Sequence, residues 1–154
     1  MKVRVADFEK DGAKIIEGAW RFIEQIENKD WLPEDRDSFE TNFIELCRNP
    51  ALEVFVADHD GEPVAGIGLL ASPYWLNPQM LAVEDMFWFA FKEAPPMAAA
   101  MVLRRAIDWA KEKAKPNKVI FTLSRIVGTS PSAVEQIYEK LELNHTEIRH
   151  TGVL

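Results

Sequence analysis

Hydrophobic positions recur with two different periods in the first third of the chain. Alternation predicts a short strand at residues 3–5, after which apolar residues repeat every three or four positions over 11–27, as on one face of a helix. A second helix is expected to begin at Asp37 or Ser38, either of which can cap a helix, and to end before Pro50.

The middle of the chain has the two-residue period of β-strands. Strands are predicted at 52–57, 64–71 and 80–91, with the tight-turn signal Asp-Gly inside 59–62. The stretch 72–78, with two prolines and two aromatic residues, is expected to be a connecting loop. These connections are too short to hold crossover helices, so the three strands should be antiparallel neighbours.

The last third returns to the helical period and then to strands. A helix is predicted over 97–113, a strand over 117–123, a helix over 130–141 and a strand over 144–154. The element order β-α-α-β-β-β-α-β-α-β indicates an α/β fold with a mixed sheet. No repeat or linker divides the chain, so we expect a single domain over residues 1–154.

Composition narrows the class of protein. Hydrophobic residues make up 47% of the 154 residues and the net charge is −7, which together favour a folded domain and disfavour a general nucleic-acid surface. No stretch is long and apolar enough to span a bilayer, and the N-terminus has no signal-peptide pattern. A cytoplasmic protein is therefore expected.

The residue types that usually form catalytic or metal sites are sparse. Phosphate-loop, dinucleotide-binding and HExxH motifs are absent from the sequence. His59 is placed at a turn, and His145 and His150 fall on opposite faces of a strand, so no metal site is expected. Cys47, the single cysteine, and the helical stripe around Trp20 are interpreted as core.

Two polar features remain as candidates for chemistry. Glu84 and Asp85 interrupt an apolar strand, and alternation sends them to opposite faces, so one of them must face whatever covers the sheet. A buried carboxylate has a raised pKa and can act as a general base or hold an amine; a strand-edge pair in water is the alternative. Tyr138 can donate a proton to a thiolate, or simply pack with its hydroxyl in water.

These residues resemble those of a known family. The segment VEQIYEKLEL, residues 134–143, resembles the pattern A-x-x-L-Y-E-K-x-G-F that ends a helix in the GNAT family of acetyl-CoA-dependent N-acetyltransferases. The segment LRRAIDWA, 103–110, is similar to the helix after that family's cofactor loop. The segment EDMFWF, 84–89, is similar to the strand before it, notably in short members from bacteriophage genomes. The resemblance covers nearly the whole chain and implies a GNAT-like acyl-CoA N-acyltransferase fold with a splayed central sheet.

The resemblance also implies an activity. Acetyl would pass from acetyl-CoA to a primary amine, of a protein lysine or N-terminus or of a small molecule, by direct attack. Tyr138 would protonate the departing CoA thiolate, and Glu84 or Asp85 would take the amine proton or anchor the amine. The strand 87–91 would bind the pantetheine arm, and the next helix would face the pyrophosphate. The implied cofactor-binding residues are Phe87, Trp88, Phe89, Ala90, Met97, Ala98, Ala99 and Ala100.

The chain departs from the family at the cofactor loop. Where the family has Q/R-x-x-G-x-G/A, this chain has APPMAA at 94–99, and its two prolines lack N–H donors. The Gly-Phe of the tyrosine helix is replaced by Glu142-Leu143. An alternative therefore stays open, a binding or structural module with the same fold. In that interpretation Tyr74-Trp75 forms an exposed apolar patch, and a lid packed over the sheet is the alternative for this segment. The oligomeric state, a homodimer included, and the amine acceptor stay open.

Overall fold

The computed structural model describes residues 1–24, 35–124, 136 and 138–140. The predicted strand 144–154 and most of the helix 130–141 lie outside them. None of the described helices combines the length and hydrophobicity needed to cross a lipid bilayer. The described elements are β1 (Lys2–Val5), α1 (Phe8–Glu24), α2 (Arg36–Cys47), β2 (Leu52–His59), β3 (Glu62–Tyr74), β4 (Asn77–Ala90), α3 (Ala98–Ala114) and β5 (Val119–Thr122).

The five described strands form one sheet in the order β1-β2-β3-β4-β5. The first four are antiparallel, as predicted for the middle strands, and β5 runs parallel to β4. A parallel pair needs a crossover connection, which α3 supplies. The predicted Asp-Gly turn is confirmed, because Asp60 and Gly61 connect β2 to β3 with φ of 54° and 91°.

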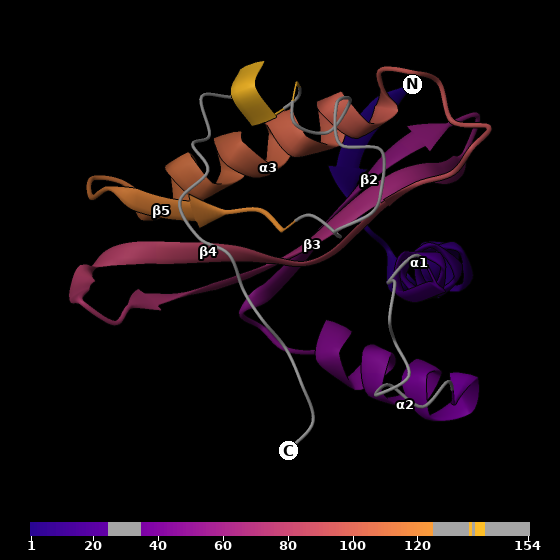
Figure 1. The fold of residues 1–154 in the computed structure, drawn as a ribbon, viewed down its shortest axis with the longest axis horizontal. Helices are drawn as coiled ribbons and strands as arrows, with labels where there is room; N and C mark the ends of the chain where they lie inside the picture. Colours follow the sequence, from indigo (N-terminus) through magenta and orange to yellow (C-terminus); the bar gives the residue numbers. More distant parts are fainter. Residues whose placement is uncertain (25–34, 125–135, 137, 141–154) are drawn as a thin grey trace.

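Helices cover both faces of the sheet, with α1 and α2 on one side and α3 on the other (Figure 1). The core under α3 buries side chains of all the middle strands together with the inner face of that helix. The core under α1 and α2 is smaller and rich in aromatic rings. Its buried members are Ile15, Ala19, Phe43, Val54, Val56, Phe87, Phe89 and Phe91.

An extra residue in β4 determines which side chains reach which face. Gly68 pairs with Phe87 but the next residue, Leu69, pairs with Asp85, so Met86 is the extra residue of a β-bulge. Before the bulge, Val83 faces α3; after it, Phe87 faces α1 and α2. The sequence pattern did not predict this reversal, because regular alternation would keep residues 83, 85 and 87 on one face.

Glycines make room for the aromatic rings that follow the bulge. A Cβ at Gly68 would lie 2.2 Å from the Phe87 ring, and one at Gly66 would lie 2.8 Å from the Phe89 ring. Gly18 of α1 meets the same Phe89 ring from the other side, at 2.4 Å. The rings of β4 therefore lie directly on the backbones of β3 and α1.

Three predicted boundaries are wrong, each because of a local polar group or a short turn. Helix α1 begins at Phe8, since the Asp7 carboxylate accepts the Glu9 N–H at 3.1 Å. Helix α2 is capped by Asp35, whose carboxylate accepts the Ser38 N–H, and not by Asp37 or Ser38. The stretch 72–78 is not a loop, because β3 and β4 continue to a two-residue turn with Tyr74 opposite Asn77.

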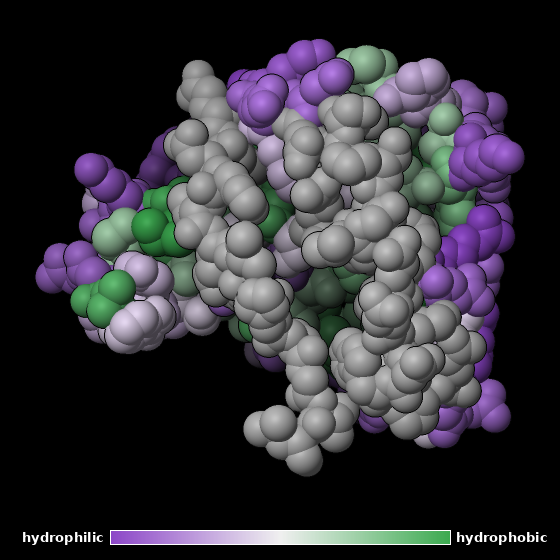
Figure 2. All heavy atoms as spheres, in the orientation of Figure 1, coloured by the Kyte–Doolittle hydropathy of each residue, from purple (hydrophilic) through white to green (hydrophobic). Residues whose placement is uncertain are grey.

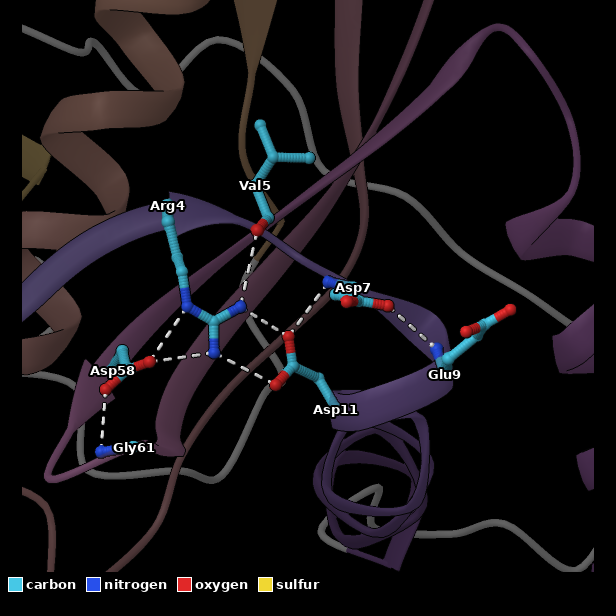
Figure 3. Close-up of polar contacts among 7 residues, drawn as sticks. All are labelled: Arg4, Val5, Asp7, Glu9, Asp11, Asp58 and Gly61. Carbon is cyan, nitrogen blue, oxygen red and sulfur yellow. Dashed lines mark hydrogen bonds and ion pairs between the residues drawn. The ribbon is translucent and has the colours of Figure 1, made fainter.

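An arginine between two carboxylates ties the N-terminal elements together (Figure 3). Arg4 of β1 donates from Nη2 to Asp11 Oδ1 of α1 at 2.9 Å and from Nε to Asp58 Oδ2 at 2.8 Å. The Asp11 carboxylate also accepts the Asp7 N–H, and the Asp58 carboxylate accepts the Gly61 N–H, both at 2.9 Å. One cation thus fixes the start of α1 and the β2–β3 turn against the edge strand.

Candidate active site

The parallel pairing of β4 and β5 stops partway along β4. The register runs from Leu81 opposite Val119 to Glu84 opposite Thr122, whereas β4 continues to Ala90. Among the described residues, the edge of β4 beyond Glu84 has no strand partner on the β5 side. The splayed central sheet expected from the sequence is confirmed at this point.

A carboxylate and a phenol are hydrogen-bonded to the same residue, Ser124, just after the pairing ends. Ser124, just after β5, donates its N–H to Asp85 Oδ1 at 2.8 Å. The Ser124 carbonyl oxygen in turn accepts the hydroxyl of Tyr138 at 2.8 Å. Tyr138 also packs against the core under α3. One residue therefore links the two side chains that the sequence singled out from distant segments.

Glu84 and Asp85 lie on opposite faces, as alternation predicted. Asp85 pairs with Leu69, which belongs to the core under α3, whereas Glu84 pairs with Leu70 on the other face. Burial raises the pKa of Asp85 above its ordinary value, against hydrogen bonds from Ser124 that lower it, with a further raising contribution from Glu84. The same face of the sheet therefore holds a carboxylate of raised pKa and the phenol.

The expected pantetheine-binding residues divide by face. The rings of Phe87 and Phe89 are buried under α1 and α2, so these two residues can offer only backbone groups to a ligand at the β4 edge. Trp88 lies on the α3 side, and its indole Nε1 is buried without a hydrogen-bond partner among the described residues. Ala90, the last residue of β4, is exposed. Because unpaired buried donors are rare, the indole N–H marks a place where a ligand acceptor fits.

The start of α3 keeps two free backbone donors. Met97 is exposed at the N-cap, and the Ala98 N–H is used by the Pro95 carbonyl at 2.8 Å. The N–H groups of Ala99 and Ala100 have no backbone acceptor among the described residues. Free N–H groups at a helix N-terminus favour anions, so this end can face a phosphate despite the two prolines before it.

Cys47 lines a groove of about 600 Å³ between α1 and α2, on the face away from Asp85 and Tyr138. Burial raises the pKa of its thiol to about 12, so it stays protonated at neutral pH, in line with the structural role expected for it. His59 is exposed beside Asp60. In the described ranges, no three His, Cys, Asp or Glu side chains gather as a metal site requires.

Sequence reasoning missed two residues of this site. Ser124 was not singled out, and its only sequence signal is a small polar residue directly after a strand. Met86, the bulge residue, carries no signal in the hydrophobic pattern. A weak indication was available in Gly66 and Gly68, whose spacing matches that of the large rings at Phe87 and Phe89 in the next strand.

Comparison with known proteins finds similarity at the level of structure. No protein-family model matches the sequence, nor does any curated protein. The acetyltransferase Tb11.01.2886 of Trypanosoma brucei superposes with a TM-score of 0.69 at 15% identity, covering 99% of each chain. A ribosomal-protein-alanine N-acetyltransferase from Brucella melitensis gives 0.66 at 14% identity, covering 100% of this chain and 99% of that one.

A third solved structure contains the expected co-substrate. It is a protein of Clostridium acetobutylicum described as a predicted acetyltransferase with acetyl-CoA, and it superposes with a TM-score of 0.69 at 16% identity, covering 99% of this chain and 95% of that one. The likeness extends over essentially the full length in all three cases. The fold expected from the sequence is therefore confirmed: this chain has the mixed α/β fold of the GNAT acetyltransferases.

Proposed function

We propose that the protein is an N-acetyltransferase that moves an acetyl group from acetyl-CoA to a primary amine. The observation that carries the proposal is the end of the β4–β5 pairing, where Asp85 and Tyr138 are joined through Ser124. A base and an acid on one face of an opening in the sheet are what acyl transfer from a thioester requires. The fold shared with acetyltransferases supports the same assignment.

The residues present fit the co-substrate, although with fewer donors than the family pattern supplies. The Trp88 indole N–H and the unpaired edge of β4 would bind the amide groups of the pantetheine arm. The N–H groups of Ala99 and Ala100 would face the pyrophosphate, while Pro95 and Pro96 contribute none. The net charge of −7 favours a cationic acceptor such as a lysine side chain or a polyamine.

In the proposed reaction Asp85 takes a proton from the acceptor ammonium group, directly or through one water. The amine nitrogen forms a bond to the thioester carbonyl carbon, and the carbon–sulfur bond then breaks with its electron pair on sulfur. The Tyr138 hydroxyl gives its proton to that thiolate and regains one from the amide nitrogen being formed. The raised pKa of Asp85 suits this role, because a carboxylate that binds protons more tightly is a stronger base.

Release of CoA in the presence of amines tests the proposal. The purified protein is incubated with acetyl-CoA and a lysine peptide, a peptide with a free N-terminus or a polyamine. CoA is measured by chromatography, because the Cys47 thiol would add to a thiol-reagent signal. We expect Tyr138→Phe to lower turnover by about 100-fold while acetyl-CoA affinity stays nearly unchanged. Tyr74→Phe, at the chain's other tyrosine, is the matched control and should keep full turnover.

Variants of the two carboxylates identify the base. Asp85→Asn should lower turnover by a similar factor and remove the acidic limb of the pH profile, whereas Glu84→Gln should retain most activity. A larger loss in Glu84→Gln would assign the base to the opposite face of the sheet. Failure of the wild-type protein to bind acetyl-CoA at millimolar concentration would overturn the acetyltransferase assignment and favour the binding-module alternative.

A further inference from the structure

The β3–β4 hairpin extends beyond the rest of the sheet as a two-stranded ribbon, residues 72–80 (Figure 1). Strand β2 pairs with β3 only as far as Leu70, and β5 pairs with β4 only from Leu81 onward. Both outer edges of the ribbon therefore lack strand partners among the described residues. A two-stranded ribbon is marginally stable in water by itself, so it gains from packing against another surface.

The tip of the ribbon is hydrophobic and exposed. Trp75 is 80% exposed and Leu76 is 63% exposed, and the Tyr74 ring meets the Trp75 ring edge-on at 6.3 Å. Figure 2 shows the hairpin end projecting from the left side of the molecule, with green hydrophobic atoms at its tip beside pale and purple, more hydrophilic ones. The lid alternative for Tyr74-Trp75 is thus wrong, and the exposed patch remains. Aromatic residues clustered at an exposed tip are typical of protein interfaces.

Strand addition is an unsuitable way to cover this ribbon. Pro73 in β3 and Pro78 in β4 lack N–H donors, and proline on exposed strands disfavours pairing with a further strand. A partner would therefore have to contact the side chains of the tip and not the backbone edges.

The lack of charge on the ribbon favours a second copy of this chain as the partner. The sequence from Ala71 to Val83 contains no charged residue, whereas the chain as a whole carries a net charge of −7. Two copies of an acidic chain repel each other over most of their surfaces, and the ribbon is a place where they can meet without opposing like charges. A two-fold contact needs one self-complementary patch, which an uncharged aromatic tip provides.

We infer that the ribbon tip is a docking site for a second copy of this chain, which forms a two-fold dimer through Trp75 and Leu76. The ribbon lies at the end of β4 opposite the β4–α3 connection, so the contact leaves the opening beyond Glu84 accessible (Figure 1). The inference goes beyond the proposed acetyltransferase function, and neither depends on the other.

The mass in solution tests the inference. Light scattering coupled to size exclusion should give twice the 17.6 kDa of one chain at high protein concentration, and dilution should shift it toward one chain. The double variant Trp75→Ser, Leu76→Ser should have the single-chain mass at every concentration. Val5→Ser, which removes an exposed hydrophobic residue from the edge strand β1, away from the ribbon, is the matched control and should remain dimeric.

Hydrogen exchange on the wild-type protein keeps the test valid if the double variant does not fold. Amides of residues 72–80 should exchange more slowly at high than at low concentration. A single-chain mass at all concentrations, or a dimer that persists in the folded double variant, would overturn the inference. Binding of the monomer to neutral lipid vesicles through Trp75 would also overturn it, in favour of a membrane contact. Acetyl-CoA binding by the double variant reports separately on the proposed function.

Discussion

Removal of the guanidinium group of Arg4 is the sharpest test of what holds the N-terminal elements together. Arg4→Met preserves most of the side chain's apolar length and leaves Asp11, 0% exposed, and Asp58, 7% exposed, without their cation. Taking one partner from a buried ion pair costs about 3–5 kcal/mol. Because the Arg4 side chain is itself 22% exposed, water screens part of this interaction, and we expect a loss of about 2–3 kcal/mol in the free energy of unfolding.

The loss should depend on pH in a defined direction. The hydrogen bond from Arg4 is the main cause that lowers the pKa of Asp11, and likewise that of Asp58, below the ordinary value. A lowered folded-state pKa gives stability that is present above the unfolded-state pKa of about 3.9 and is lost as pH falls through the folded value. The difference between wild type and Arg4→Met should therefore be widest near neutral pH and should shrink below about pH 4.

Urea unfolding followed by tryptophan fluorescence measures both quantities. Arg48→Met is the control, because its partner Glu45 and Arg48 itself are largely exposed, and its effect should stay within about 0.5 kcal/mol. A loss under about 1 kcal/mol for Arg4→Met at neutral pH, or a loss that does not change with pH, would refute the ion-pair reasoning.

Three further predictions concern the two faces of β4. Trp88→Phe removes the buried indole N–H and should weaken acetyl-CoA binding by about fivefold in calorimetry, the worth of one hydrogen bond. Trp20→Phe is the control and should not weaken binding, because the Trp20 N–H is bonded to Glu24 on the other face of the sheet. Equal acetyl-CoA affinities of Trp88→Phe and the wild type would exclude the indole as a ligand donor. Asp85→Asn should raise the melting temperature at pH 8 but not at pH 4, because the raised pKa of Asp85 means that its ionisation costs stability as pH rises. A lower melting temperature of the variant than of the wild type at pH 8 would contradict this. Gly68→Ala should lower the free energy of unfolding by about 1–3 kcal/mol in chemical denaturation, because the added Cβ overpacks the Phe87 ring. Gly12→Ala is the control and should be neutral or stabilising, because its Cβ would meet only one ring atom, at 3.9 Å. Equal effects of the two substitutions would show that the Phe87 ring can move.

The strands and helices could be predicted from the sequence where a regular period dominates. The antiparallel middle strands, the Asp60-Gly61 turn and helix α3 all follow from local patterns. The hairpin tip could not, because Pro73 and Pro78 are typical of loops and are tolerated here only since the ribbon edges have no strand partner among the described residues. Helix starts were placed too late because aspartates at positions 7 and 35 compete with later capping residues.

The candidate site could be predicted in its chemistry but not in its geometry. Glu84, Asp85 and Tyr138 were singled out as residue types, and alternation placed the two carboxylates on opposite faces. That Asp85 is the one connected to Tyr138 depends on Ser124, which links them through its backbone N–H and carbonyl oxygen and has no distinctive sequence pattern. Contacts made by main-chain atoms of residues far apart in sequence leave no periodic trace.

The extra residue in β4 makes the length of this strand as important as its composition. Deleting Met86 would make Asp85 and Phe87 adjacent, and regular alternation would keep Asp85 facing α3 and the Phe87 and Phe89 rings facing α1 and α2. Those rings would keep their places over Gly66 and Gly68. A second residue inserted beside Met86 would instead move every later side chain of β4 to the other face, so this strand should tolerate the loss of one residue at the bulge but not the gain of one.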